Sequence, residues 1–182
     1  MMRPFGFTLC RASAVALVAT ACGSVSEVNQ PAASSSQAAA TSSSATAKVT
    51  AHVGATLTLT DEQVTLTKVI DPATGADQYT VPDTGKRFVA TVFTIKNTAS
   101  QAGQGDANSN TSVIGSDNQG YSPDFSNVSE CTNFNDGSFE LGPGESVSGC
   151  VVFQLPTGVT VAKVQWSPSS GFSGDFAEWL VP

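Results

Sequence analysis

"GCVVFQLPTG", residues 149–158, is an apolar run that begins beside a cysteine and ends at a proline and a Thr-Gly turn. Successive side chains of a β-strand point to opposite faces, so Val151, Phe153 and Leu155 share one face and Cys150 lies on the other. We expect the three apolar side chains to face a core and Cys150 to lie on the outer, solvent side of its strand. The run therefore predicts a strand of a layered β-protein.

Strand patterns continue on both sides of this run. The stretch "RFVATVFTIKN" (87–97) is apolar at both odd and even positions, which is typical of a central strand covered on two sides. The polar stretch 98–110 is expected to be a loop, and residues 142–145, Gly-Pro-Gly-Glu, a type II turn. Eight or nine short strands at this spacing predict an all-β fold, a two-sheet antiparallel sandwich. The other strand patterns lie at 55–60, 63–71, 111–116, 121–125, 138–141, 159–166 and 175–181.

Three segments of this pattern resemble a known family. They read "GKRFVATVFTIKNTA" (85–99), "GYSPD" (120–124) and "LGPGESVSGCVVFQLP" (141–156), and a tryptophan follows late in the chain. In these motifs, taken in order, the chain is similar to the domain-of-unknown-function family 4352 of actinobacterial lipoproteins and secreted proteins. The resemblance covers most of residues 54–182 and implies an immunoglobulin-like β-sandwich, akin to a small immunogenic secreted protein of mycobacteria. It implies no settled activity and supplies no catalytic residue.

The N-terminus has the pattern of an export signal. Residues 1–11 carry two arginines and no acidic residue, and a short apolar stretch with small residues follows up to Cys22. This stretch is too short to span a bilayer. Its end, "VATAC", resembles the bacterial lipobox, which implies cleavage after Ala21 and attachment of a diacylglycerol to Cys22. The alternative is ordinary cleavage after Ala21, which would leave a free secreted protein.

Composition divides the chain after the signal peptide of residues 1–21. Residues 22–47 are mostly Ser, Ala and Thr and contain no aromatic residue, so we predict a disordered, lipid-anchored linker. Residues 48–182 are long enough for one folded domain with a core of its own. The formal net charge is −7 and no basic stripe occurs, which argues against nucleic acid as a partner and against direct adsorption to anionic lipid.

Cys131 and Cys150 are the only cysteines that remain once Cys10 leaves with the signal and Cys22 is lipidated. Two remaining cysteines in an exported chain predict one disulfide bond. A zinc or blue-copper site would lack ligands, because His52 is the only histidine. No basic residue flanks either cysteine to favour a reactive thiolate. We therefore expect a structural disulfide that fastens the preceding loop across the outside of a sheet.

Aromatic residues give candidate binding surfaces as well as candidate core. Phe125, Phe134 and Phe139 lie in the loop before the cysteine-bearing strand, and we expect the fold to cover them. The alternative is a partner-binding surface. Trp166 and Trp179 lie in predicted strands, and we expect both in the core, the alternative being an exposed platform for carbohydrate or peptide.

Polar residues offer two weaker candidates. His52 stands alone at the start of the domain, without a nucleophile motif that would make it a general base. The stretches "NFNDG" (133–137) and "SDNQG" (116–120) resemble calcium loops faintly, but they lack the spacing of alternate oxygen ligands with a closing glutamate. Turn chemistry explains their Asn, Asp and Gly residues equally well.

The sequence contains no recognisable catalytic set, metal-ligand set or cofactor motif. We therefore expect a non-enzymatic bacterial lipoprotein, exported and lipid-anchored to the outer face of the cell membrane, whose domain binds an unknown protein or envelope ligand. Two alternatives stay open: a cell-envelope enzyme or enzyme subunit, and a structural spacer. A deep pocket flanked by acids of raised pKa would favour the enzyme, and a featureless polar surface would favour the spacer.

Overall fold

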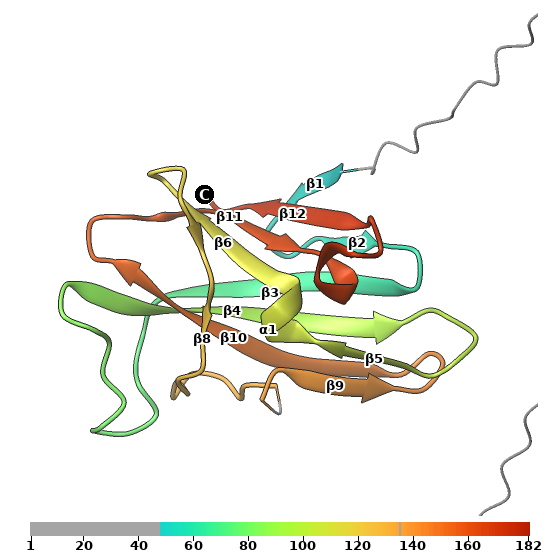
Figure 1. Ribbon diagram of the computed structural model, residues 1–182, viewed down its shortest axis with the longest axis horizontal. Coiled ribbons are helices and arrows are strands. Elements are labelled where there is room, and N and C mark those ends of the chain that lie inside the picture. Colours follow the sequence, from blue (N-terminus) through green and yellow to red (C-terminus); the bar gives the residue numbers. More distant parts are fainter. Residues whose placement is uncertain (1–47, 135) are drawn as a thin grey trace, which may run out of the picture. The chain divides into compact units, whose positions relative to one another are not determined.

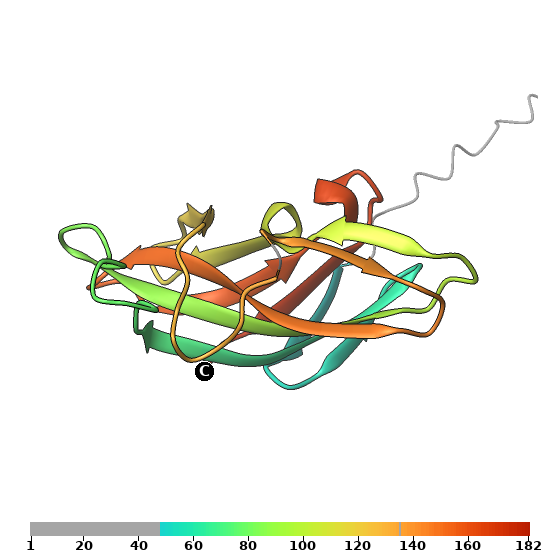
Figure 2. The same ribbon diagram turned by 90° about the horizontal axis from the view of Figure 1, so that it is seen from below.

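Two five-stranded sheets pack face to face in the computed structural model, which describes residues 48–134 and 136–182 (Figure 1 and Figure 2). The predicted signal peptide, Cys22 and the predicted linker lie outside these residues. Within the described part of the chain, no helix is long and apolar enough to cross a membrane.

Each sheet combines strands from distant parts of the sequence. Sheet I has the order β1-β12-β11-β6-β7, and sheet II has the order β2-β3-β4-β10-β8. The strands of sheet I are β1 (Lys48–His52), β6 (Thr111–Gly115), β7 (Gly120–Tyr121), β11 (Val161–Trp166) and β12 (Phe176–Leu180). Those of sheet II are β2 (Thr56–Thr58), β3 (Glu62–Ala73), β4 (Lys86–Asn97), β8 (Pro123–Asp124) and β10 (Ser146–Pro156). A separate ribbon pairs β5 (Gly103–Asp106) with β9 (Ser138–Leu141), and two short helices are α1 (Ala107–Asn110) and η1 (Pro168–Gly171).

The predicted all-β sandwich of two main sheets is confirmed, with three local differences. β1 pairs in parallel with β12, whereas the other strand pairs are antiparallel. The predicted loop at 98–110 contains β5 and α1, because its glycines and asparagines form a short ribbon and a helical turn. β3 continues past Pro72, which the sequence indicated as a break, since the proline lies at a register shift where no ladder hydrogen bond is required.

The core between the sheets is centred on an aromatic cluster. Phe93 of β4 packs against Trp166 and Trp179 of sheet I, with ring centroids 5.2 Å and 6.0 Å apart. All three side chains are fully buried, as expected for both tryptophans. The indole N–H of Trp179 donates to the carbonyl of Ala55 at 2.9 Å, so its polar atom is satisfied on burial.

A second, smaller core lies on the other face of sheet II. It joins Cys150 and Val152 of β10 with Phe88 and Ala90 of β4 and with Val128 of the loop after β8. Cys150 thus lies on the outer face of its strand, as expected, but it is only 1% exposed, so the expectation that this side faces solvent is wrong. The loop formed by residues 125–134 covers it, and a disulfide joins Cys150 to Cys131 of this loop, with the Cα atoms 6.2 Å apart.

The three phenylalanines of the 125–140 segment have different environments. Phe134 is buried with its ring against Gly149, where an added Cβ would lie 2.9 Å from the ring. Phe139 is half-buried in β9. Phe125 is 80% exposed, so the expectation that the fold covers it is wrong. Phe125 directly follows Asp124, where β8, the edge strand of sheet II, ends, so its ring lies outside the sheet.

Candidate ligand cleft

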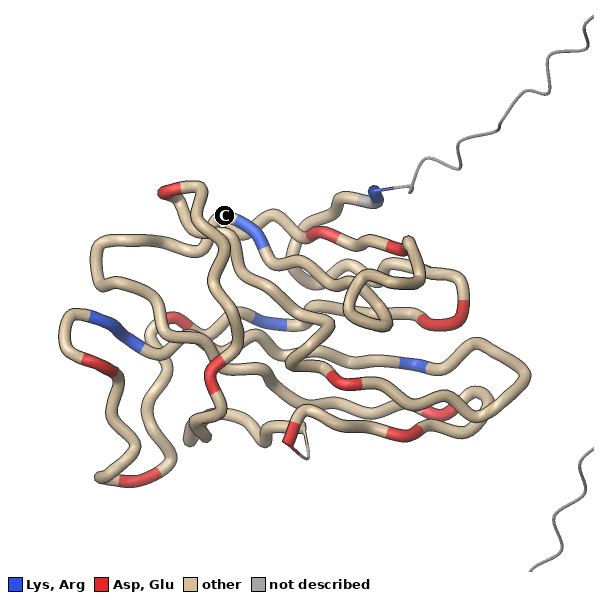
Figure 3. The backbone as a smooth tube through the Cα atoms, viewed as in Figure 1, with Lys and Arg blue, Asp and Glu red and all other residues tan. Residues whose placement is uncertain are grey.

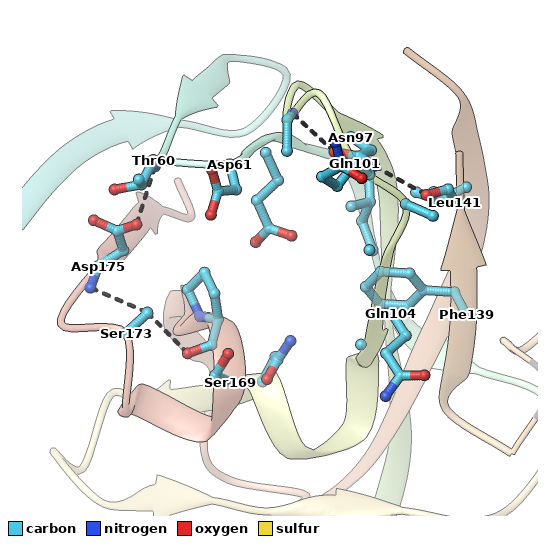
Figure 4. Close-up of a pocket in the computed structure, with 18 residues that line it drawn as sticks. Thr60, Asp61, Asn97, Gln101, Gln104, Phe139, Leu141, Ser169, Ser173 and Asp175 are labelled. Carbon is cyan, nitrogen blue, oxygen red and sulfur yellow. Dashed lines mark hydrogen bonds between the residues drawn. The ribbon is translucent and has the colours of Figure 1, made fainter. Parts of the chain in front are cut away.

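A cleft of about 450 Å³ opens at one end of the sandwich. It is formed by the turn between β2 and β3, by β5 and the segment before it, by η1 and by the segment that leads into β12 (Figure 1 and Figure 4). These segments are far apart in the sequence, and the register of the two sheets brings them together. A cleft of this size lies within the range of small-molecule sites.

One side of the cleft is acidic. Asp61, Glu62 and Asp175 line it, and Figure 4 shows Asp61 and Asp175 on the side opposite Phe139 and Gln104. Figure 3 shows acidic positions in red in the turn between β2 and β3 and in the segment that leads into β12. No Lys, Arg or His occurs among the lining residues, and none of the ion pairs in the described chain involves these three carboxylates. The acidic side therefore has no cationic partner within the described residues.

Two hydrogen bonds hold the acidic side in place. The backbone N–H of Thr60 donates to Oδ2 of Asp175 at 3.0 Å, which ties the turn after β2 to the segment before β12. The indole N–H of Trp166 donates to Oε1 of Glu62 at 2.5 Å, so a residue of the aromatic core holds this carboxyl group in position. Each of these two carboxyl groups thus keeps one oxygen for other partners.

Burial raises the pKa of Glu62 above its usual value of 4.5. The negative charges of Asp175 and Asp61 act in the same direction, whereas the hydrogen bond from Trp166 opposes them. Glu62 is thus a carboxyl group whose charged form is disfavoured by its surroundings.

The other side of the cleft depends on Asn97 at the end of β4. Its amide nitrogen donates to the carbonyls of Gln101 and Leu141 at 2.8 Å and 2.9 Å, and its amide oxygen accepts from the N–H of Ala99 at 2.8 Å. The side chain is buried, and these bonds occupy both of its polar atoms. Asn97 therefore folds the chain after β4 back against β9 and sets the position of β5.

Phe139 supplies an aromatic surface on this side. Its ring lies over Gly105 of β5, where an added Cβ would come within 2.4 Å of the ring. The ring stacks on Trp166 with an interplanar angle of 28° and a centroid distance of 6.5 Å. Glycine at position 105 is thus required by the close approach of the ring to the backbone.

Asn110, at the end of α1, lies 6% exposed in the lining of the cleft. Its amide oxygen accepts from the N–H of Ser170 at 2.9 Å. No hydrogen-bond partner of its amide nitrogen occurs among the described residues, yet no fully buried side-chain nitrogen or oxygen in this part of the chain lacks a partner. The amide nitrogen therefore reaches solvent, and the residue lines the cleft.

Of the residues singled out in the sequence, Phe139 lines the cleft and the others lie elsewhere. The disulfide Cys131–Cys150 is on the far face of sheet II, and His52 is exposed at the end of β1. Asp117 of "SDNQG" uses its carboxylate in a turn, where it accepts from the N–H of Gln119 at 3.1 Å and from the hydroxyl of Tyr121 at 2.8 Å. In the described ranges, no group of three or more His, Cys, Asp or Glu side chains is arranged to hold a metal ion.

Sequence reasoning missed the acidic residues of the cleft. Asp61 and Glu62 read as a turn between two strands, and Asp175 as the start of the last strand. One signal in the sequence could have indicated them. Asp61 and Glu62 are adjacent acids directly before an alternating strand, and this position places one of the two carboxyl groups beside the core.

The fold and cleft define an all-β sandwich of two main sheets with an acidic cleft at one end. The chain belongs to the family described as "Domain of unknown function (DUF4352)", whose model matches residues 51–177. The expected family is thereby confirmed. No curated protein sequence matches the chain.

Several solved structures are similar to the sandwich. The secreted protein MPT63 from Mycobacterium tuberculosis has a TM-score of 0.50 and 17% identity, over 74% of this chain and 98% of that chain. A "putative lipoprotein" (ycdA) from Bacillus subtilis has a TM-score of 0.48 and 14% identity, over 71% of this chain and 38% of that chain. An uncharacterized β-sandwich protein from Clostridium difficile has a TM-score of 0.46 and 13% identity, over 74% and 94% of the two chains. At 17% identity, the likeness to MPT63 shows the fold alone.

Proposed function

We propose that the chain is an exported, lipid-anchored bacterial binding protein that holds a small envelope ligand in the cleft. The observation that carries the proposal is the cleft itself. Its lining contains carboxyl oxygens and an amide nitrogen that have no partner among the described residues, and the ring of Phe139 lies on the other side. A concave site with a few polar groups beside an apolar surface is typical of small-molecule binding.

Export is supported by two independent features. The disulfide between Cys131 and Cys150 is of a kind that persists in oxidising compartments. The lipobox-like residues before Cys22 supply the anchor in this proposal. The described fold and the predicted N-terminal signals thus favour the same location.

The binding role is tested with the isotope-labelled full chain in detergent micelles, titrated with soluble fragments of digested bacterial envelope. We expect amide NMR shifts in residues that line the cleft, such as Gln104 and Asn110. Ala102 also lines the cleft and is exposed, so Ala102→Trp should block the shifts. The matched variant Ser100→Trp changes an exposed residue of the same segment outside the lining and should leave the shifts intact. No shift in the cleft, or equal shifts in both variants, would refute the proposal.

A cell-envelope enzyme is the second candidate, and the raised pKa of Glu62 favours it. A carboxyl group whose pKa is raised keeps its proton to a higher pH, which suits the role of a general acid. This candidate predicts that the full chain releases new reducing ends or amines from envelope polymers and that Glu62→Gln abolishes the release. A spacer role gains no support from a surface that contains such a cleft.

A further inference from the structure

The acidic side of the cleft offers hydrogen-bond acceptors without donors. Neither side-chain oxygen of Asp61 has a hydrogen-bond partner within the described residues, and Asp175 and Glu62 each use one oxygen. Carboxylates accept and, when ionised, cannot donate. The carboxylates of Asp61 and Asp175 in a concave site, without a cation beside them, produce a local negative potential that attracts positive charge.

A separate observation favours an acceptor on the ligand. Asn110 lines another wall of the cleft and is 6% exposed, and its amide nitrogen has two N–H donors but no partner among the described residues. This donor is independent of the acidic side. α1 leads into β6 of sheet I, whereas the turn after β2 joins two strands of sheet II. A ligand that fills the cleft would meet acceptors on one side and a donor on the other.

On the basis of the binding function proposed above, we infer that the ligand carries a primary ammonium group beside a carbonyl or hydroxyl oxygen. The ammonium group donates to the free oxygens of Asp61 and Asp175, and the neighbouring oxygen accepts from the amide nitrogen of Asn110. This chemistry is shared by the amine of an amino acid or peptide and by an amino sugar. The apolar remainder of the ligand packs against Phe139.

Paired probes test the ammonium group directly. The full chain in detergent micelles is titrated with glucosamine and N-acetylglucosamine, and with alaninamide and N-acetylalaninamide, while the amide NMR signals of the cleft are followed. Acetylation removes the charge and two donors but keeps the rest of each molecule. We expect the amines to shift the signals of Asp61 and Asn110. The acetylated partners should bind with a Kd at least about fivefold higher.

A matched pair of variants locates the binding charge. Asp61→Asn removes one cleft carboxylate whose side chain has no other bond to lose, and it should raise the Kd of the amine at least about fivefold. Asp136→Asn makes the same change of side chain and net charge at an exposed position outside the cleft lining, and it should leave the Kd unchanged.

The outcomes separate this inference from the proposed function. Binding by glucosamine alone assigns the amino sugar, and binding by alaninamide alone assigns the amino acid or peptide amine. Equal binding of an amine and its acetylated partner, or no binding by either amine, overturns the inference. In those cases the titration with envelope fragments still decides whether the cleft binds a ligand at all, because it does not depend on an ammonium group.

Discussion

Glu62 shows how a single residue links the core to the cleft. Its carboxyl group accepts from the indole of the buried Trp166 and stands beside Asp61 and Asp175. Because its pKa in the folded chain is raised above 4.5, the folded state favours the protonated form. The associated stability is fully present below the usual pKa and is lost as the pH rises through the raised value.

Glu62→Gln should therefore raise the melting temperature at about pH 7.5 and have little effect at about pH 3.5. Glutamine keeps an oxygen that accepts from Trp166 and removes the disfavoured charge. Each kcal/mol gained corresponds to about 3–5 °C in a domain of this size. Thermal unfolding of both chains at the two pH values checks this, with Glu140→Gln on exposed β9 as the control. A gain that is the same at both pH values would contradict the assigned cause.

Gly105 and Gly103 provide a matched pair within β5. An added Cβ at position 105 meets the ring of Phe139 at 2.4 Å, whereas one at position 103 meets its nearest neighbour, Asn97, at an ordinary 3.7 Å. We expect Gly105→Ala to lower the free energy of unfolding by about 1–3 kcal/mol through overpacking and Gly103→Ala to change it little. Urea unfolding measures both. Equal effects would mean that the ring of Phe139 does not fix position 105.

Among the elements, the loop formed by residues 125–134 depends most on one covalent link. It covers the second core through Val128, and isolated bridges at Gly75–Val128 and Asn133–Cys150 join it to its neighbours. These few backbone contacts make the loop dependent on the disulfide for its position.

Replacing both cysteines by alanine, Cys131→Ala with Cys150→Ala, should lower the free energy of unfolding by about 3 kcal/mol, because the disulfide closes a loop between positions with a sequence separation of 19. Hydrogen exchange should show lost protection in residues 125–134 before any loss in β4 or β10. A variant with the protection and unfolding free energy of the original chain would show that packing alone holds the loop.

Periodicity predicted the elements that are covered by other elements and missed those that depend on distant partners. β4 and β10 are apolar on both faces, and both faces are buried, as their patterns indicate. The face of Cys150 and the loop across it were expected, but its burial was missed, because alternation does not show that Val128 of this loop packs into a second core. β1 and β5 have weak patterns of their own, and their pairing with β12 and β9 forms them. The cleft needs four such segments together, so no local pattern indicated it.

At the scale of the whole molecule, anchoring depends on Cys22, which lies outside the described residues. In the proposed lipoprotein, Cys22→Ser removes the acceptor of the diacylglycerol and should move the protein from the membrane fraction to the soluble extracytoplasmic fraction. Incorporation of labelled palmitate should fall to background, while the melting temperature of the sandwich stays unchanged. A chain that stays in the membrane fraction after this change would contradict the proposed anchor.

β1 also determines how the domain would carry tension. Lys48, where the described chain begins, is in register with Phe176, and the adjacent Asp175 lines the cleft. A pull between a cleft-bound ligand and an anchored N-terminus would therefore follow a short path through β12 and β1. The load would fall on the β1–β12 ladder and on the ion pair of Lys48 Nζ with Glu178 at 2.9 Å.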